Sequence, residues 1–154
     1  MINIVSKFID EKSLCKSDNK LLVAISGGAD SVALFLCLKE LGYDVELAHC
    51  NFNLRGDESD NDEEFVKQLA DKFGVALHLK SFDTQKYADE NKVSIQMAAR
   101  DLRYKWFNEL LVDNNLNYIA VGHHKNDDVE TFFINLTRGS GLKGLLGIKS
   151  KNNK

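Results

Sequence analysis

One stretch of the sequence combines residue types that suit phosphate binding. Ser26-Gly27-Gly28-Ala29-Asp30-Ser31 follows a short apolar run and precedes a segment with helical spacing. Glycines at such a turn let the backbone approach a ligand closely, and the N-terminus of the next helix favours an anion. Hydroxyls of Ser26 and Ser31 could donate to phosphate oxygens. Asp30 would repel those phosphates unless a cation lay between them, so we expect Mg²⁺ there.

A helix cap is the alternative interpretation of this loop. Asp30 or Ser26 would then cap the helix, and the glycines would only form a turn. The loop contains neither a Walker A sequence nor GxGxxG, so those two nucleotide-binding patterns are excluded.

Three further stretches carry residues that could recognise anions, metals or bases. The first two are His49-Cys50-Asn51-Phe52-Asn53-Leu54-Arg55 and Ala99-Arg100-Asp101-Leu102-Arg103-Tyr104. The third begins at Gly122-His123-His124, includes Asp127 and Glu130, and continues to Arg138-Gly139-Ser140-Gly141. On a helix Asp127 and Glu130 would share one face, which suits a metal ion or an ammonium group. Alternatively, both carboxylates only complement the dipole at a helix N-terminus.

Together with SGGADS, these stretches resemble the tRNA-isoleucine lysidine synthetases, a family of PP-loop ATP pyrophosphatases. That family carries SGGxDS, HxNHxLR, ARxxRY, HHxxDxxET and RGSGxxGL in this order, and the resemblance extends from about Lys20 to Ile148. Phe52 departs from the pattern, because the family often has histidine there. An essential acid–base role at this position is therefore in doubt.

The resemblance implies a two-step reaction on isoleucine tRNA with a CAU anticodon. ATP adenylates the C2 carbonyl oxygen of the wobble cytidine, and the amine of free L-lysine then attacks C2 and releases AMP. The implied catalytic residues are Asp30, Arg100, Asp127 and Glu130, with Asp30 and Asp127 holding Mg²⁺. Ser26, Gly27, Gly28, Ala29, Asp30, Ser31 and His49 would bind ATP, and Asn51, Arg55, Arg103, His123 and Arg138 would bind the other substrates.

Simpler interpretations remain for several of these residues. Arg100 and Arg103 could form a solvated basic stripe, and His49 could pack in the core. A PP-loop tRNA thiolase is the nearest alternative enzyme, but Cys15, Cys37 and Cys50 include no CxxC pair that would serve sulfur chemistry. A nucleotide-binding module without turnover is a second alternative, and it would not need Arg100, Asp127 and Glu130 together.

The elements that must position these residues follow from the hydrophobic periodicity. Strands are expected over 20–26, 44–50, 75–82 and 117–123, and helices over about 31–42, 63–73, 95–112 and 126–136, with an amphipathic helix in the first eighteen residues. Strands that alternate with helices predict a doubly wound α/β fold, with a parallel sheet and helices on both faces. Ligands of such sheets bind beyond the carboxyl ends of the strands, where the loop at 26–31 begins.

The amino-acid composition further restricts the class of protein. The chain has 154 residues, a formal net charge of −3, 44% apolar residues and no proline, which indicates a globular domain and excludes collagen-like or low-complexity chains. No apolar run approaches the roughly 20 residues of a membrane span, so we expect a cytoplasmic protein without a membrane partner. A homodimer is one possible assembly.

We expect an N-terminal helix over 1–19 and a PP-loop domain over 20–154. The resemblance implies that the catalytic domain continues further, so the chain is expected to be a fragment without the tRNA-binding domains, and to bind nucleotide better than it modifies tRNA.

Overall fold

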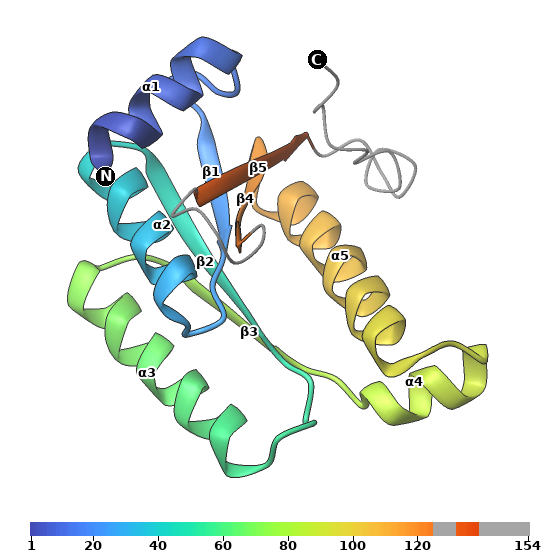
Figure 1. Ribbon diagram of the computed structural model, residues 1–154. Helices are drawn as coiled ribbons and strands as arrows, with labels where there is room; N and C mark the ends of the chain where they lie inside the picture. Colours follow the sequence, from blue (N-terminus) through green and yellow to red (C-terminus); the bar gives the residue numbers. More distant parts are fainter. Residues whose placement is uncertain (125–131, 139–154) are drawn as a thin grey trace.

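A mixed β-sheet with helices on both faces forms the centre of the molecule (Figure 1). The computed structural model describes residues 1–124 and 132–138, with side chains over 1–122. Within these residues the strands are β1 (Lys20–Ala24), β2 (Asp44–Asn51), β3 (Leu77–Ser81), β4 (Tyr118–His124) and β5 (Phe132–Arg138). Their order is β3-β2-β1-β4-β5; the first four run parallel and β5 runs antiparallel to β4.

Five helices in the described part connect and cover these strands. They are α1 (Ile2–Lys12), α2 (Ala29–Glu40), α3 (Asp57–Phe73), α4 (Thr84–Asn91) and α5 (Ile95–Asp113). Figure 1 shows α1, α2 and α3 on one side of the sheet and α4 and α5 on the other. The expected doubly wound α/β fold is therefore confirmed, with one antiparallel strand added at the edge.

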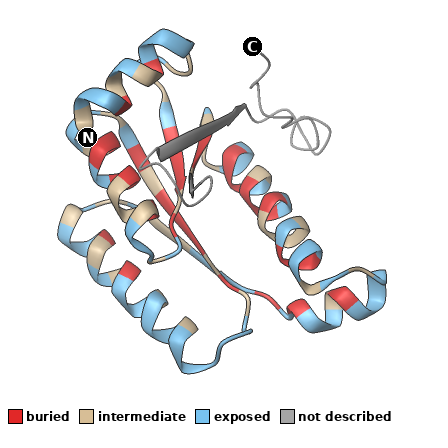
Figure 2. Cartoon of the chain, viewed as in Figure 1, coloured by how far each residue is buried: buried red, intermediate tan, exposed pale blue. Residues whose placement is uncertain are grey.

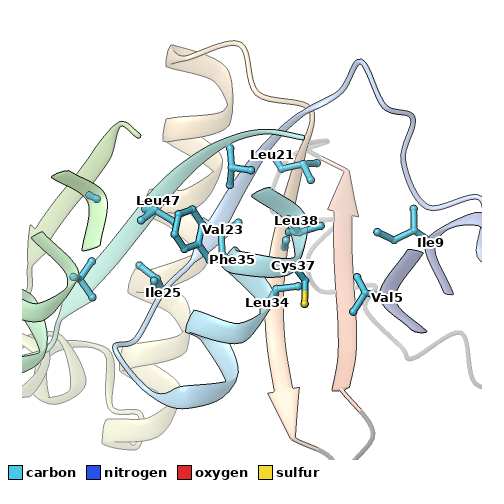
Figure 3. Close-up of a cluster of buried hydrophobic side chains, with 14 residues drawn as sticks. Val5, Ile9, Leu21, Val23, Ile25, Leu34, Phe35, Cys37, Leu38 and Leu47 are labelled. Carbon is cyan, nitrogen blue, oxygen red and sulfur yellow. The ribbon is translucent and has the colours of Figure 1, made fainter. Parts of the chain in front are cut away.

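Two apolar clusters hold the helices to the sheet. Side chains alternate along a strand, so Leu21 and Val23 of β1 contact α1, α2 and α3, whereas Leu22 contacts the α5 side. Figure 3 shows the first cluster around Phe35 of α2, and the second includes Phe107 of α5, which is 1% exposed. Burial of one such side chain contributes about 1.5–3 kcal/mol, so both faces stabilise the sheet edge that carries the functional residues.

Burial follows the same two layers in Figure 2, where buried residues lie along the central strands and on the sheet-facing sides of the helices. β1 is buried from Leu21 to Val23, whereas β3, at the edge, is largely exposed. Among the described helices, none has both the length and the apolar character needed to cross a bilayer.

One expected helix is corrected by the structure. The helix over 126–136 is wrong for its C-terminal half, because Phe132–Arg138 is strand β5, paired with β4 from His124↔Phe132 to Tyr118↔Arg138. Aromatic and β-branched residues in this segment favour a strand, and β4 offers them an open edge. The short helix α4 was not expected from the sequence, and α3 begins at Asp57, inside an acidic run that carries little apolar periodicity.

Candidate functional site

The candidate site lies where the sheet changes winding direction. From β1 the chain proceeds to β2 and β3 on one side, and it later returns to place β4 on the other side of β1. The strand order therefore reverses between β1 and β4, and ligands of α/β sheets bind beyond the carboxyl ends of the strands at such a switch point. Ser26–Gly28 belongs to the connection from β1 to α2, and Ala29–Ser31 begins α2, so the loop lies at a strand-to-helix turn as the sequence predicted.

Glycine makes the turn of this loop possible. Gly27 has φ +96°, a backbone conformation that residues with a Cβ rarely adopt. A Cβ at this position would also lie 3.2 Å from Cβ and Oδ1 of Asp62 on α3. Gly28 is the N-cap of α2 and supplies no side-chain acceptor. The amides of the first turn of α2 therefore lack a side-chain cap, so the capping interpretation by Ser26 or Asp30 is wrong.

The two serine hydroxyls brace the loop. Ser31 Oγ donates to Gly28 O at 2.9 Å, and Ser26 Oγ accepts from Gly28 N at 3.2 Å. The two hydroxyls also lie 3.1 Å apart, and Ser26 must be the donor because Ser31 has already used its single proton. Ser31 is buried, so its hydroxyl shapes the loop, whereas Ser26 borders the cavity described next and can redirect its proton to a ligand.

A cavity of about 440 Å³ opens beside the loop. Its walls come from the carboxyl ends of β1 and β2, the connection after β2, and the first turns of α3 and α5. The lining residues are Ser26, His49, Cys50, Phe52, Leu54, Arg55, Ser59, Asp62, Ile95, Gln96, Ala99 and Arg103. The sequence predicted four of them as functional, and the fold brings those four together: Ser26, His49, Arg55 and Arg103.

His49 is held in one tautomer by the backbone. Its Nδ1 lies 2.8 Å from Ile25 O, and because a carbonyl oxygen only accepts, Nδ1 must carry the proton. In the neutral ring Nε2 is then the remaining acceptor. His49 is only 4% exposed yet lines the cavity, so it is both a packed core residue and a potential ligand contact.

The two arginines of α5 have different environments. Arg103 lines the cavity, with its guanidinium carbon 5.3 Å from the centre of the Phe52 ring. Arg100 is exposed, lies over Tyr104 at 5.1 Å, and does not line the cavity. Ser94 sets the phase of this helix, because its hydroxyl caps the start by accepting from Met97 N at 3.1 Å.

Asn51 connects strand β2 to helix α3 beside the cavity. It is 4% exposed, and its amide donates to Asp60 Oδ1 and to Glu63 Oε2, both at 3.3 Å. A hydrogen bond from Lys67 lowers the pKa of the Glu63 carboxyl, with Asn51 adding to the effect. Asn51, predicted to bind substrate, thus joins β2 to α3 and is not among the residues that line the cavity.

Asp30 lies at the junction of β1, β4 and α2. A Cβ on Gly122 of β4 would lie 3.3 Å from the Asp30 carbonyl oxygen, so this glycine lets α2 approach β4 closely. In the described part no group of three or more His, Cys, Asp or Glu side chains is arranged to hold a metal. Asp127 and Glu130 lie outside the described residues, as do the side chains of His123 on β4 and Arg138 on β5.

Sequence reasoning missed several lining residues, Asp62 and Ser59 among them. Both belong to the acidic run at 55–64, and helical spacing places them on the same side of α3 as buried Val66. Phe52 was noted only as a departure from a motif. Cys50 also lines the cavity, and burial raises the pKa of its thiol to about 12 although Arg103 and Lys80 oppose the shift. Cys50 is therefore protonated at neutral pH and is not a nucleophile.

A phosphate held at the start of α2 would lie at the edge of the cavity, and the remaining space could take the rest of a small phosphorylated ligand. A parallel α/β sheet with such a loop at its switch point is the architecture of nucleotide-binding domains.

Comparison with known proteins places the chain within that class. The family model of the PP-loop domain matches residues 2–154, so the chain belongs to the PP-loop family. It is 53% identical over 148 residues to a tRNA(Ile)-lysidine synthase of Bacteroides thetaiotaomicron, covering 96% of this chain and 35% of that protein. It is 50% identical over 154 residues to the same enzyme of Porphyromonas gingivalis, covering 99% of this chain and 34% of that protein.

The chain thus spans about a third of the length of these relatives. Among solved structures, an NH3-dependent NAD synthetase of Campylobacter jejuni matches with a TM-score of 0.57 at 16% identity, over 81% of this chain and 55% of that chain. That similarity supports the fold alone.

Proposed function

We propose that this chain is the ATP-binding catalytic part of a ligase that forms lysidine in isoleucine tRNA with a CAU anticodon. The observation that carries the proposal is the agreement between a chain-wide similarity to tRNA(Ile)-lysidine synthases and the site geometry. Ser26, at the start of the loop, lines one cavity with His49, Arg55 and Arg103. Membership of the PP-loop family supports ATP as the nucleotide.

In the proposed first step, the C2 carbonyl oxygen of the wobble cytidine attacks the α phosphorus of ATP. The bond to the β-phosphate oxygen breaks and pyrophosphate leaves. Charge develops on phosphate oxygens, so catalysis consists mainly of positioning and electrostatic stabilisation. The amides at the start of α2 and the Ser26 hydroxyl would hold the pyrophosphate, while Arg103 would contact a phosphate oxygen from the opposite wall. Arg100, which is exposed on α5, remains the proposed contact of the α phosphate or the cytidine.

In the second step, the neutral amine of free L-lysine attacks C2, and the C2–O bond to AMP breaks. The attacking nitrogen must lose a proton, and Glu130 is the proposed acceptor. Asn51, Arg55, His123 and Arg138 remain predicted contacts of cytidine, tRNA or lysine. Because phosphate neutralisation dominates nucleic-acid affinity, a net charge of −3 predicts weak tRNA binding by this chain alone.

Mg²⁺ is proposed at Asp30 and Asp127. Asp30 lies in the first turn of α2, and Asp127 comes three residues after the end of β4 in the sequence. The ion would neutralise charge between these carboxylates and the phosphates. A cytoplasmic location and a possible homodimer are proposed on the family resemblance alone.

The test is AMP formation and lysine incorporation into isoleucine tRNA by a protein that contains this chain. Wild-type protein should release AMP and incorporate lysine, and Asp30→Ala should do neither while retaining its thermal unfolding temperature. Asp18→Ala, in the connection before β1, is the matched control and should behave like wild type.

Two other results would point elsewhere. Sulfur transfer to tRNA without lysine incorporation would favour a thiolase. ATP binding without AMP formation, with tRNA and lysine present, would favour a module without turnover.

A further inference from the structure

Phe52 lines the cavity, but the proposed chemistry gives it no role. Its ring lines the cavity, and the Arg103 guanidinium carbon lies 5.3 Å from the ring centre. The ring also stacks on Phe82, with centres 5.6 Å apart and planes 19° from parallel. Phe82 in turn meets Trp106 of α5 edge-on at 6.1 Å. Arg103 and Trp106 both belong to α5, so the aromatic rings join the loop after β2 to that helix.

The backbone around Phe52 is held firmly. Phe82 N donates to Asn51 O at 2.8 Å, and Asn53 Nδ2 donates back to Phe82 O at 3.0 Å. Thr84 Oγ1, which is buried, donates to Phe52 O at 2.8 Å. The ring therefore lies on a short segment whose flanking polar groups are paired with the segment after β3. Such a ring can restrict a flexible arginine without moving itself.

Arg103 has no competing anion among the described residues. None of the ion pairs found there within 4.0 Å involves its guanidinium. A cation over an aromatic face is attracted to the ring quadrupole, and this contact leaves the N–H donors at the rim of the guanidinium free for an incoming oxygen. An arginine that is already restricted loses less conformational entropy on binding, which strengthens the ligand contact.

We propose that Phe52 is a positioning residue that holds Arg103 in the cavity wall, where its guanidinium binds a phosphate of the nucleotide. This role rests on the proposed function for its ligand, but the contact itself does not depend on any ligand. It also explains how a position without acid–base chemistry can contribute to the site.

A double-mutant cycle with ATP binding as the readout tests the proposal. Phe52→Leu removes the ring quadrupole but keeps an apolar side chain, and it should weaken ATP binding measured by calorimetry about three- to tenfold. Arg103→Ala should weaken binding more, and Phe52→Leu should have almost no further effect in the Arg103→Ala background. Phe52→Tyr retains the ring face and should bind ATP within about twofold of wild type.

Phe65→Leu is the matched control, because Phe65 is an exposed phenylalanine on α3 that does not line the cavity. It should leave ATP binding unchanged. The single tryptophan, Trp106, provides a folding check, because its emission should stay constant in every variant that retains the packed α5. If Phe52→Leu does not fold, the Phe52→Tyr and Phe52→Met pair gives the same comparison of ring against no ring.

A ligand-free measurement separates this proposal from the proposed function. In NMR spectra, the side-chain resonances of Arg103 should carry a ring-current shift that disappears in Phe52→Leu and persists in Phe52→Tyr. An unchanged Arg103 resonance in Phe52→Leu would overturn the positioning role, as would an equal loss of ATP affinity with and without Arg103. Failure of the wild-type protein to bind ATP would instead overturn the proposed function, and with it the phosphate as ligand of Arg103.

Discussion

Replacing Gly27 by alanine tests whether the phosphate loop depends on a backbone conformation and a close contact together. Gly27 has φ +96°, and a Cβ there would lie 3.2 Å from Cβ and Oδ1 of Asp62. An L-residue forced to positive φ costs about 1–2 kcal/mol, and crowding against a packed neighbour adds about 1–3 kcal/mol. We therefore expect Gly27→Ala to lower the free energy of unfolding by about 2–5 kcal/mol.

Two other glycines separate the cost of backbone strain from the cost of the contact with Asp62. Gly42 has φ +85°, and a Cβ there would meet nothing within 4 Å, so Gly42→Ala reports strain alone, about 1–2 kcal/mol. Gly28 has φ −73° and only Ser26 Oγ at 3.4 Å, so Gly28→Ala should change stability least. Urea unfolding gives all three values, and for a domain of this size each kcal/mol corresponds to about 2–4 °C in Tm.

ATP affinity should also distinguish the Gly27 and Gly42 variants. Gly27→Ala moves the amides and the Ser26 hydroxyl at the start of α2, so ATP affinity should fall at least about tenfold, the equivalent of one lost charge-assisted hydrogen bond. Gly42→Ala lies at the opposite end of α2 and should bind ATP normally. If Gly27→Ala were no less stable than Gly42→Ala, the contact with Asp62 would have no energetic effect and the reasoning would be refuted.

Three further predictions concern the surroundings of the site. Asn51→Asp places a third carboxylate beside Asp60 and Glu63 and removes the amide that donates to both. It should destabilise the fold by about 2–4 kcal/mol at pH 7, and by less at pH 4, because protonation relieves the repulsion. An equal loss of stability at both pH values would contradict this account. Because burial raises the pKa of Cys50 to about 12, iodoacetamide should label it more slowly than a free thiol at pH 8, and urea should abolish the difference. The unfolded thiol ionises first, so this residue's contribution to stability should decline as the pH rises above about 8.5, and rapid native labelling would show that the thiol is accessible. Phe107→Ala removes a side chain that is 1% exposed and should lower the free energy of unfolding by about 3–5 kcal/mol. Val112 on the same helix is 80% exposed, so Val112→Ala should change that free energy by no more than about 0.5 kcal/mol. Similar losses for the two variants in urea unfolding would contradict the assignment of Phe107 to the second cluster.

Several parts of the fold could be predicted because their signals are local. The strand-to-helix turn at Ser26–Ser31 combines a buried apolar run, two glycines and a following helix within a dozen residues. α5 was predicted almost to its ends, because its apolar residues repeat with helical period. α4 was missed since its eight residues carry little apolar periodicity and its cap, Asp83, is a weak signal alone.

The segment that forms β5 was predicted wrongly, because its structure depends on a non-local contact. Phe132 and Phe133 are adjacent and Leu136 follows at helical spacing, so a helical period was a reasonable expectation. The strand obtains its hydrogen bonds from β4, which lies eight residues earlier and is itself placed by β1. A pattern of side chains cannot reveal whether an open sheet edge is available to pair with.

The sequence by itself determined the α/β class, the phosphate loop and the order of the motif residues, since these depend on short-range periodicity and on backbone freedom at Gly27. Only the tertiary structure decided which of two arginines on one helical face enters the cavity. Arg103 meets Phe52 and lines the cavity, whereas Arg100 lies over Tyr104 outside it. Likewise, Asn51 and Asp62 acquired their places from the packing of α3 against β2 and the loop. The physical reason is that these choices depend on contacts between elements distant in sequence, which the local pattern of residue types does not encode.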